Sequence, residues 1–200
     1  MTNNVEQSSC DTSIDFIIKD KGLVSSCVLS FGFTRFLSLA YFIRDLPYGR
    51  VVQSDSVISV IKEHRGTCSS KHLLLATLSN EAERDDIQLM VGIYQMSEKN
   101  TPGIGTVLQE SGLSFIPEAH CYLKVGNIRY DFTGLKKGET SPFESLLYEK
   151  CVLPSDLYKI KERLHQAEIL KYALQLNLNS QKVWKVREAC IRNLSERSAD

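Results

Sequence analysis

The sequence predicts an α+β protein in which N-terminal helices pack on a small antiparallel β-sheet, followed by C-terminal helices. Apolar residues recur at helical spacing up to residue 78, whereas apolar and polar residues alternate from residue 86 on. Helical spacing returns after residue 155. Because runs of helices and runs of strands succeed one another, the pattern favours α+β over an alternating α/β fold.

Composition limits the classes of function. The chain has 200 residues, of which 42% are hydrophobic and 24% charged, and its formal net charge is zero. The chain has no excess of basic residues that would indicate nucleic-acid binding, and no apolar run is long enough to cross a membrane. We expect a flexible tail over 1–12 and one domain over 13–200, with a catalytic core at about 55–134 and a helical part at about 155–195.

The cysteines and the first residues indicate the compartment. Residues 1–12 lack a basic stretch followed by an apolar one, so we expect no secretory signal and a cytoplasmic protein. The six cysteines are scattered without a C-x-x-C pair. We therefore expect reduced thiols and no disulfides. We also expect no cofactor.

The helical pattern covers five segments. Three predicted helices precede the strands, at 31–46, at 56–63 with Ser54 or Asp55 as N-cap, and at about 68–78. Two follow the strands, at about 156–174 with Ser155 or Asp156 as cap, and at about 180–194. The segment 13–30 shows both periodicities, so its state stays open.

The strand pattern covers four segments. Strict alternation predicts a strand over about 86–96, and residues 146–153 form a further candidate. Strands 119–125 and 128–133 flank Gly126-Asn127, a pair suited to a tight hairpin turn. Between the first strand and the hairpin, residues 97–117 form a long connection with glycines and prolines, of the kind that often serves as a lid or binding loop.

Cys68 is the candidate nucleophile. The Gly66-Thr67 pair ends the preceding segment, and an apolar helical run follows Cys68 at once. Free backbone N–H groups and the macrodipole at a helix start favour a thiolate over a thiol. A nucleophilic cysteine still needs a base and a group that orients the base.

The predicted hairpin supplies both groups. With Gly126-Asn127 as a two-residue turn, Val125 pairs with Ile128, and Tyr122 with Asp131. His120 and Asp131 then share one face as diagonal neighbours, close enough for the carboxylate to orient the imidazole. The opposite face is nearly all apolar, and we expect it to belong to the core; it carries Cys121, Leu123, Val125, Ile128, Tyr130 and Phe132.

These residues, in this order, resemble the transglutaminase-like superfamily, whose core is papain-like. The matching motifs are Gly66-Thr67-Cys68 before a helix, His120 at the start of a strand, and Asp131 in Tyr-Asp-Phe-Thr-Gly, so the resemblance covers about 55–134. It implies Cys68 as nucleophile, His120 as general base and acid, and Asp131 as orienting carboxylate. The implied reaction is acyl transfer through a thioester, most simply hydrolysis of an amide or peptide bond, with a peptide, protein or small amide as substrate.

Several alternatives remain open. Arg65-Gly66-x-Cys68 is also similar to the arylamine N-acetyltransferases, and a non-catalytic binding protein could keep the same fold. No spacing rule selects Tyr48 or Gln53 as the second oxyanion donor.

We also have expectations for other polar side chains near these motifs and in the helices. They are a solvated Lys71 rather than one that assists a thiolate, a partly buried or surface His72, and solvated helix residues at His64 and His165. A zinc set of Cys68, His72, His120 and Cys121 is disfavoured, because Cys121 and His120 point to opposite sides of a strand.

Overall fold

The computed structural model describes residues 13–53, 56–134 and 141–197. The chain divides into two compact units. The first comprises the chain up to Met90, Cys121–Gly134 and Cys151–Leu157, and the second comprises the intervening segments and the chain from Tyr158 on. The predicted N-caps Ser54 and Asp55 lie outside the described residues. The predicted single domain over 13–200 stays a prediction.

The predicted fold class is confirmed. Helices precede and follow a four-stranded antiparallel sheet with strand order β3-β2-β1-β4. Its strands are β1 (Ile87–Met96), β2 (Ile116–Val125), β3 (Ile128–Tyr130) and β4 (Leu146–Cys151). All four coincide with segments that the strand pattern predicted, although β2 begins three residues before 119 and β3 ends three residues before 133.

The hairpin register is confirmed. Val125 pairs with Ile128 and Leu123 with Tyr130 across β2 and β3. Gly126 adopts a φ of +55° at the first position of the turn, a backbone conformation that suits glycine and matches the twist of a two-residue hairpin. The predicted division into an apolar and a polar face is partly wrong, because Tyr122 is fully buried and Ile128 is 41% exposed.

The predicted helices are present, with shifted ends. Helix α3 (Phe36–Asp45) begins later than residue 31, since Arg35 is extended and forms an antiparallel bridge with Ile17. Helix α2 (Leu23–Ser30) occupies part of the segment that was left open, and a 3-10 turn at Pro154–Asp156 leads into α7 (Leu157–Gln175). The remaining described helices are α4 (Ser59–Lys62), α5 (Cys68–Glu81), α6 (Gly105–Glu110) and α8 (Ser180–Arg197).

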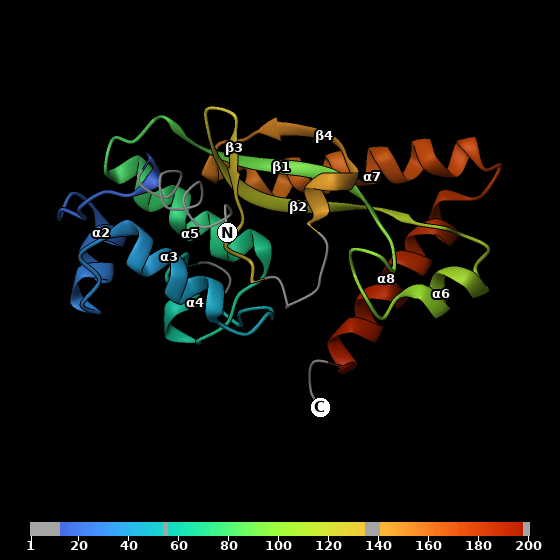
Figure 1. Cartoon of the computed structure of the whole chain (residues 1–200), viewed down its shortest axis with the longest axis horizontal. Helices are drawn as coiled ribbons and strands as arrows, with labels where there is room; N and C mark the ends of the chain where they lie inside the picture. The colour runs from blue at the N-terminus through green and yellow to red at the C-terminus, as the bar shows by residue number, and fades with distance from the viewer. Residues whose placement is uncertain (1–12, 54–55, 135–140, 198–200) are drawn as a thin grey trace, which may run out of the picture. The chain divides into compact units, whose positions relative to one another are not determined.

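Helix α5 lies at the centre of the first unit, in contact with α2, α3 and α4 (Figure 1). The helix is buried on all sides along most of its length. Leu74, Leu75 and Leu78 are fully buried, and each contributes roughly 1.5–3 kcal/mol through the hydrophobic effect. Its buried polar side chains therefore need partners inside the protein.

The 97–117 connection is part of the core of the second unit. It contains α6, and its apolar residues Ile104, Leu108 and Leu113 pack in one cluster with residues of α7 and α8. Asn193 of α8 also donates a hydrogen bond to the carbonyl of Gly103, at 2.6 Å. Trp184 of α8 packs partly buried against the same cluster.

A buried ionic group ties α7 and α8 to β2. Both carboxylate oxygens of Glu118 accept from Arg187, each at 2.7 Å. The ring Nε2 of His165 lies 2.9 Å from the carbonyl oxygen of Pro117, to which it donates. The expectation of a solvated His165 is wrong, because only 4% of the residue is exposed.

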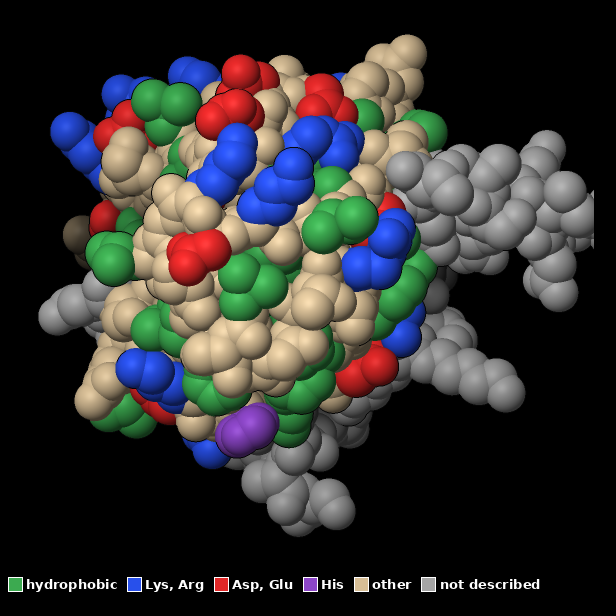
Figure 2. Space-filling view, turned by 90° about the vertical axis from the view of Figure 1, so that its left-hand side faces the viewer, with side chains coloured by type: hydrophobic (Ala, Val, Ile, Leu, Met, Phe, Trp, Pro, Cys, Tyr) green, Lys and Arg blue, Asp and Glu red, His purple; other side chains and the backbone are tan. Residues whose placement is uncertain are grey.

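One face of the molecule shows the mixture of charges expected of a chain with no net charge. On the face that Figure 2 shows, Lys and Arg side chains lie beside Asp and Glu side chains, with apolar side chains scattered between them. Within the described residues, no helix combines the length and the apolar character needed to cross a membrane.

The buried Glu118–His165 group predicts destabilisation by acid. Burial lowers the pKa of His165 below 6.5 although the Glu118 charge opposes this, so the folded state favours the neutral ring. The neutral ring of His165 therefore stabilises the folded state above pH 6.5, and this stabilisation is lost as the pH falls below that value. Burial alone would raise the pKa of Glu118, but the Arg187 hydrogen bonds and the neighbouring positive charges bring it below 4.5, which adds a second loss below pH 4.5.

Denaturant unfolding at pH 7.5, 5.5 and 4 measures this effect. We expect the free energy of unfolding to fall from pH 7.5 to 5.5, and to fall less in His165→Gln, whose amide can still donate to Pro117 but does not titrate. The same change with pH in both proteins would contradict the assignment to His165. His64→Gln, on an exposed turn, is the control and should follow the wild type.

Candidate functional site

Cys68 is the first residue of α5, as the sequence predicted. Thr67 precedes it in extended conformation, and its hydroxyl oxygen accepts from the backbone N–H of Ser70, while the Ser70 hydroxyl accepts from that of Thr67. This reciprocal capping fixes the start of the helix. Cys68 itself is 4% exposed.

Lys71 lies one turn further along α5 and is fully buried, so the expectation that it is solvated is wrong. Its ammonium group donates to three carbonyl oxygens, those of Arg44 at 3.1 Å, Leu46 at 2.7 Å and Thr133 at 2.9 Å. All three N–H donors of the ammonium group are therefore used. Two of the acceptors belong to the C-terminal end of α3, where a cation also interacts favourably with the helix dipole.

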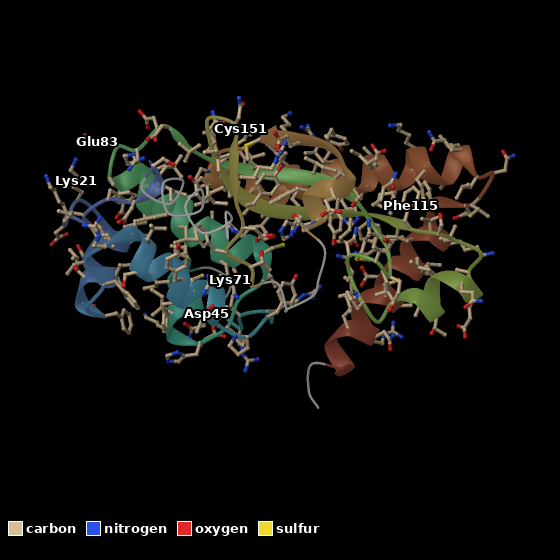
Figure 3. The ribbon with its side chains drawn as sticks, in the orientation of Figure 1. Lys21, Asp45, Lys71, Glu83, Phe115 and Cys151 are labelled. Carbon is tan, nitrogen blue, oxygen red and sulfur yellow. The ribbon has the colours of Figure 1, made fainter. Side chains whose placement is uncertain are left out.

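The charge of Lys71 is linked to those of its neighbours. Burial lowers the pKa of Lys71 to about 8, although the charges of Asp131, Asp45 and Cys68 each act to raise it. Figure 3 labels Lys71 on α5 and Asp45 at the end of α3. Because residues i and i+3 share a helix face, Lys71 and Cys68 lie on the same side of the start of α5.

His72 is fully buried, so the expectation of a partly buried or surface histidine is wrong. Its Nε2 accepts from the backbone N–H of Phe132 at 2.8 Å, which requires that nitrogen to be unprotonated. The proton is therefore on Nδ1, which donates to the backbone carbonyl of Cys68 at 2.8 Å. Since both ring nitrogens bind backbone groups, His72 offers neither a base for the thiol nor a zinc ligand.

Asp131 follows the end of β3 and its side chain is 7% exposed. Its Oδ1 accepts from the backbone N–H of Thr133 at 2.9 Å, which forms a local turn. The same oxygen lies 3.8 Å from Nε2 of His72, but the ring is neutral, so the two do not form an ion pair. The structure thus brings two of the predicted site residues, Cys68 and Asp131, to opposite sides of His72.

His120 belongs to the second unit and is partly buried. Its ring lies 6.2 Å from that of Tyr94 at a steep angle and 6.4 Å from that of Phe143. These aromatic neighbours are typical of a ring held in one orientation. The pairing of His120 with Cys68 and Asp131 stays a prediction.

The two upstream candidates for an oxyanion donor differ in their surroundings. Tyr48 forms a parallel bridge with Gly66, so the backbone of residue 48 lies against the residue two places before Cys68. The backbone N–H groups of Val52 and Gln53 both donate to the carboxylate of Glu63, at 2.7 and 3.0 Å. Tyr48 is thus held beside the turn that precedes Cys68, whereas Gln53 is held at the end of α4.

Ser69 lies between two buried thiols. Its hydroxyl is 3.4 Å from Sγ of Cys121 and 4.0 Å from Sγ of Cys68. Within the described residues, no group of three or more His, Cys, Asp and Glu side chains has the arrangement of a metal site.

A pocket of about 330 Å³ lies in the second unit. Most of its lining comes from the two ends of the 97–117 connection, and the Asn100 amide braces it by donating to the Gln95 carbonyl at 2.8 Å and to the Ser145 hydroxyl at 3.0 Å. The lining residues are Gln95, Ser97, Lys99, Asn100, Ser114, Phe115, Glu144 and Ser145.

The chain has few recognisable relatives among the proteins with which it was compared. No family model matches it, and no curated protein matches it. Among solved structures it is similar to one described as "Putative Cysteine Protease from Cytophaga hutchinsonii", with 19% identity, a TM-score of 0.37 and coverage of 64% of this chain. The aligned part spans 41% of that structure's chain.

Removing the two ring nitrogens of His72 should destabilise the first unit. In His72→Phe the Cys68 carbonyl and the Phe132 N–H both lose a buried partner, and each loss costs about 1–3 kcal/mol. We expect the free energy of unfolding to fall by about 2–6 kcal/mol in denaturant titrations. His64→Asn, on an exposed turn with a φ of +50°, is the control and should change it by less than about 0.5 kcal/mol. Equal stability of His72→Phe and wild type would contradict the structural role of this ring.

Proposed function

We propose that this chain is a cysteine enzyme of papain-like, transglutaminase-like type, which transfers acyl groups through a thioester on Cys68. Its most direct reaction is the hydrolysis of an amide or peptide bond in a peptide, protein or small amide. Cys68 is the nucleophile, His120 the general base and acid, and Asp131 the carboxylate that orients His120. Localisation in the cytoplasm is part of the same proposal.

The proposed chemistry proceeds in two stages. His120 takes the proton of the Cys68 thiol, the sulfur forms a bond to the substrate carbonyl carbon, and the imidazolium returns the proton to the leaving amine as the C–N bond breaks. His120 then takes a proton from water as the water oxygen attacks the thioester carbonyl carbon. The imidazolium returns this proton to the Cys68 sulfur as the C–S bond breaks, which releases the carboxylic acid and restores the thiol. The backbone N–H at the start of α5 stabilises the oxyanion in both stages.

One observation supports this proposal above the others. The same end of α5 carries Cys68 and holds the turn of Asp131, through the two ring nitrogens of His72 and the bond from Lys71 to Thr133. A nucleophile and an orienting carboxylate are thereby fixed by one short stretch of helix. The braced pocket lined by the 97–117 connection supports the further proposal that this connection shapes the substrate site.

A second candidate is a non-catalytic binding protein built on the same fold. The observation that favours it is the burial of Cys68, which is 4% exposed and has the Ser69 hydroxyl near its sulfur. A buried thiol with a structural role reacts slowly with small electrophiles, whereas a catalytic thiolate reacts fast. The rate of alkylation therefore separates the two candidates.

Labelling with iodoacetamide at pH 7, followed by peptide mass spectrometry, tests the proposal. We expect Cys68 to react faster than the exposed Cys151, and His120→Ala to slow Cys68 by about tenfold or more without changing Cys151. Because Cys151 is solvent-exposed, it reports any general change in conditions. Slower alkylation of Cys68 than of Cys151, unchanged in His120→Ala, would support the binding protein instead.

A further inference from the structure

The sequence favoured a solvated Lys71 over one that assists a thiolate, yet the surroundings of Lys71 in the structure are specific to a lysine. It is fully buried, and its ammonium group joins three backbone segments: the end of α3, the turn after Asp131, and α5 itself. Burying a charge of this kind is costly unless all its hydrogen bonds are made. A leucine or methionine would fill the same space without that cost, so packing alone does not explain a lysine here.

The neighbours of Lys71 fit it closely. A Cβ at Gly66 would lie 2.8 Å from Cγ of Lys71, so the residue before Thr67 must be glycine for the lysine stem to pass. A Cβ at Gly134 would lie 2.4 Å from the carbonyl oxygen of Arg44, one of the Lys71 acceptors, and Gly134 has a φ of +90°. The two glycines that flank the Cys68 turn and the Asp131 turn thus both make room for the Lys71 contacts.

The charges that face Lys71 come from each element around it. Asp45 lies at the end of α3, Asp131 follows β3, and Cys68 begins α5. The guanidinium group of Arg44 donates to the carboxylate of Asp45. Lys71 contacts Arg44 through the backbone carbonyl oxygen of that residue. Cys68 lies on the same helix as Lys71, one turn away.

We propose that Lys71 is a positioning residue of the Cys68 site, which holds the turn of Asp131 against the start of α5 and keeps a positive charge on the helix face that carries the thiol. This inference rests on the proposed role of Cys68. In this proposal Lys71 does not contact the reacting atoms themselves. Its contribution is to favour the thiolate by charge and to fix the carboxylate by its bond to Thr133.

The proposal predicts that Lys71 and Cys68 influence each other's protonation. Because binding equilibria at two interacting sites are reciprocal, removal of the Cys68 charge should make Lys71 lose its proton more easily. Removal of Lys71 should in turn move the alkylation of Cys68 to higher pH. A lysine with a purely structural role would leave the pH profile of the thiol unchanged.

The experiment measures the rate of Cys68 alkylation by iodoacetamide between pH 5 and 10 in Lys71→Met, with Lys19→Met, an exposed lysine, as control. We expect the midpoint of the profile to rise in Lys71→Met, and the rate at pH 7 to fall about tenfold for each pH unit by which the midpoint rises. Lys19→Met should match the wild type. A fast wild-type Cys68 whose profile is the same in Lys71→Met would overturn the role of Lys71 and leave the proposed function standing.

A second measurement decides the matter should Lys71→Met fail to fold. Carbon-13 NMR of labelled lysine in the wild type should show one side chain that titrates near pH 8, the value to which burial lowers the pKa of Lys71. In Cys68→Ser the midpoint of the Lys71 titration should move to lower pH. This shift is expected even if wild-type Cys68 is no more reactive than Cys151, in which case the proposed function would fail while the link between Lys71 and Cys68 would stand. An unmoved midpoint would overturn the link between the two groups.

Discussion

The first unit depends on the three hydrogen bonds of one buried ammonium group. Lys71 joins the end of α3 and the turn after Asp131 to the start of α5, and no other side chain could donate to three carbonyls from that position without a larger volume. His72 adds a second connection between the same helix and the Asp131 turn. The start of α5 is therefore fixed from two sides, which would preorganise Cys68 for the role of nucleophile that we propose.

This arrangement explains why α5 is buried although it carries so many polar residues. The polar side chains Ser70, His72 and Ser79 bond to backbone groups, so their burial leaves little unpaired polarity. Leu74, Leu75 and Leu78 then supply the apolar burial that holds the helix in place. Residues that look like a solvated face in the sequence are in fact the connections of the core.

Periodicity predicted most of the architecture. Alternation located the strands, and the Gly126-Asn127 turn fixed the register, because both signals depend on local chemistry that a sequence displays directly. The burial of Lys71, His72 and His165 was missed, since it depends on backbone partners that belong to segments distant in the chain. A signal was available for the first two: four apolar residues follow Lys71-His72 without a polar break, which is typical of a helix buried on all sides.

We propose that Cys68 forms a thioester with its substrate. Incubation with an activated ester such as p-nitrophenyl acetate, quenching in acid and mass spectrometry of the peptides test it most directly. We expect one acetyl group on the peptide of Cys68, formed faster than on exposed Cys151 and more slowly in His120→Ala. Acetylation of Cys151 alone, with an unmodified Cys68, would contradict it.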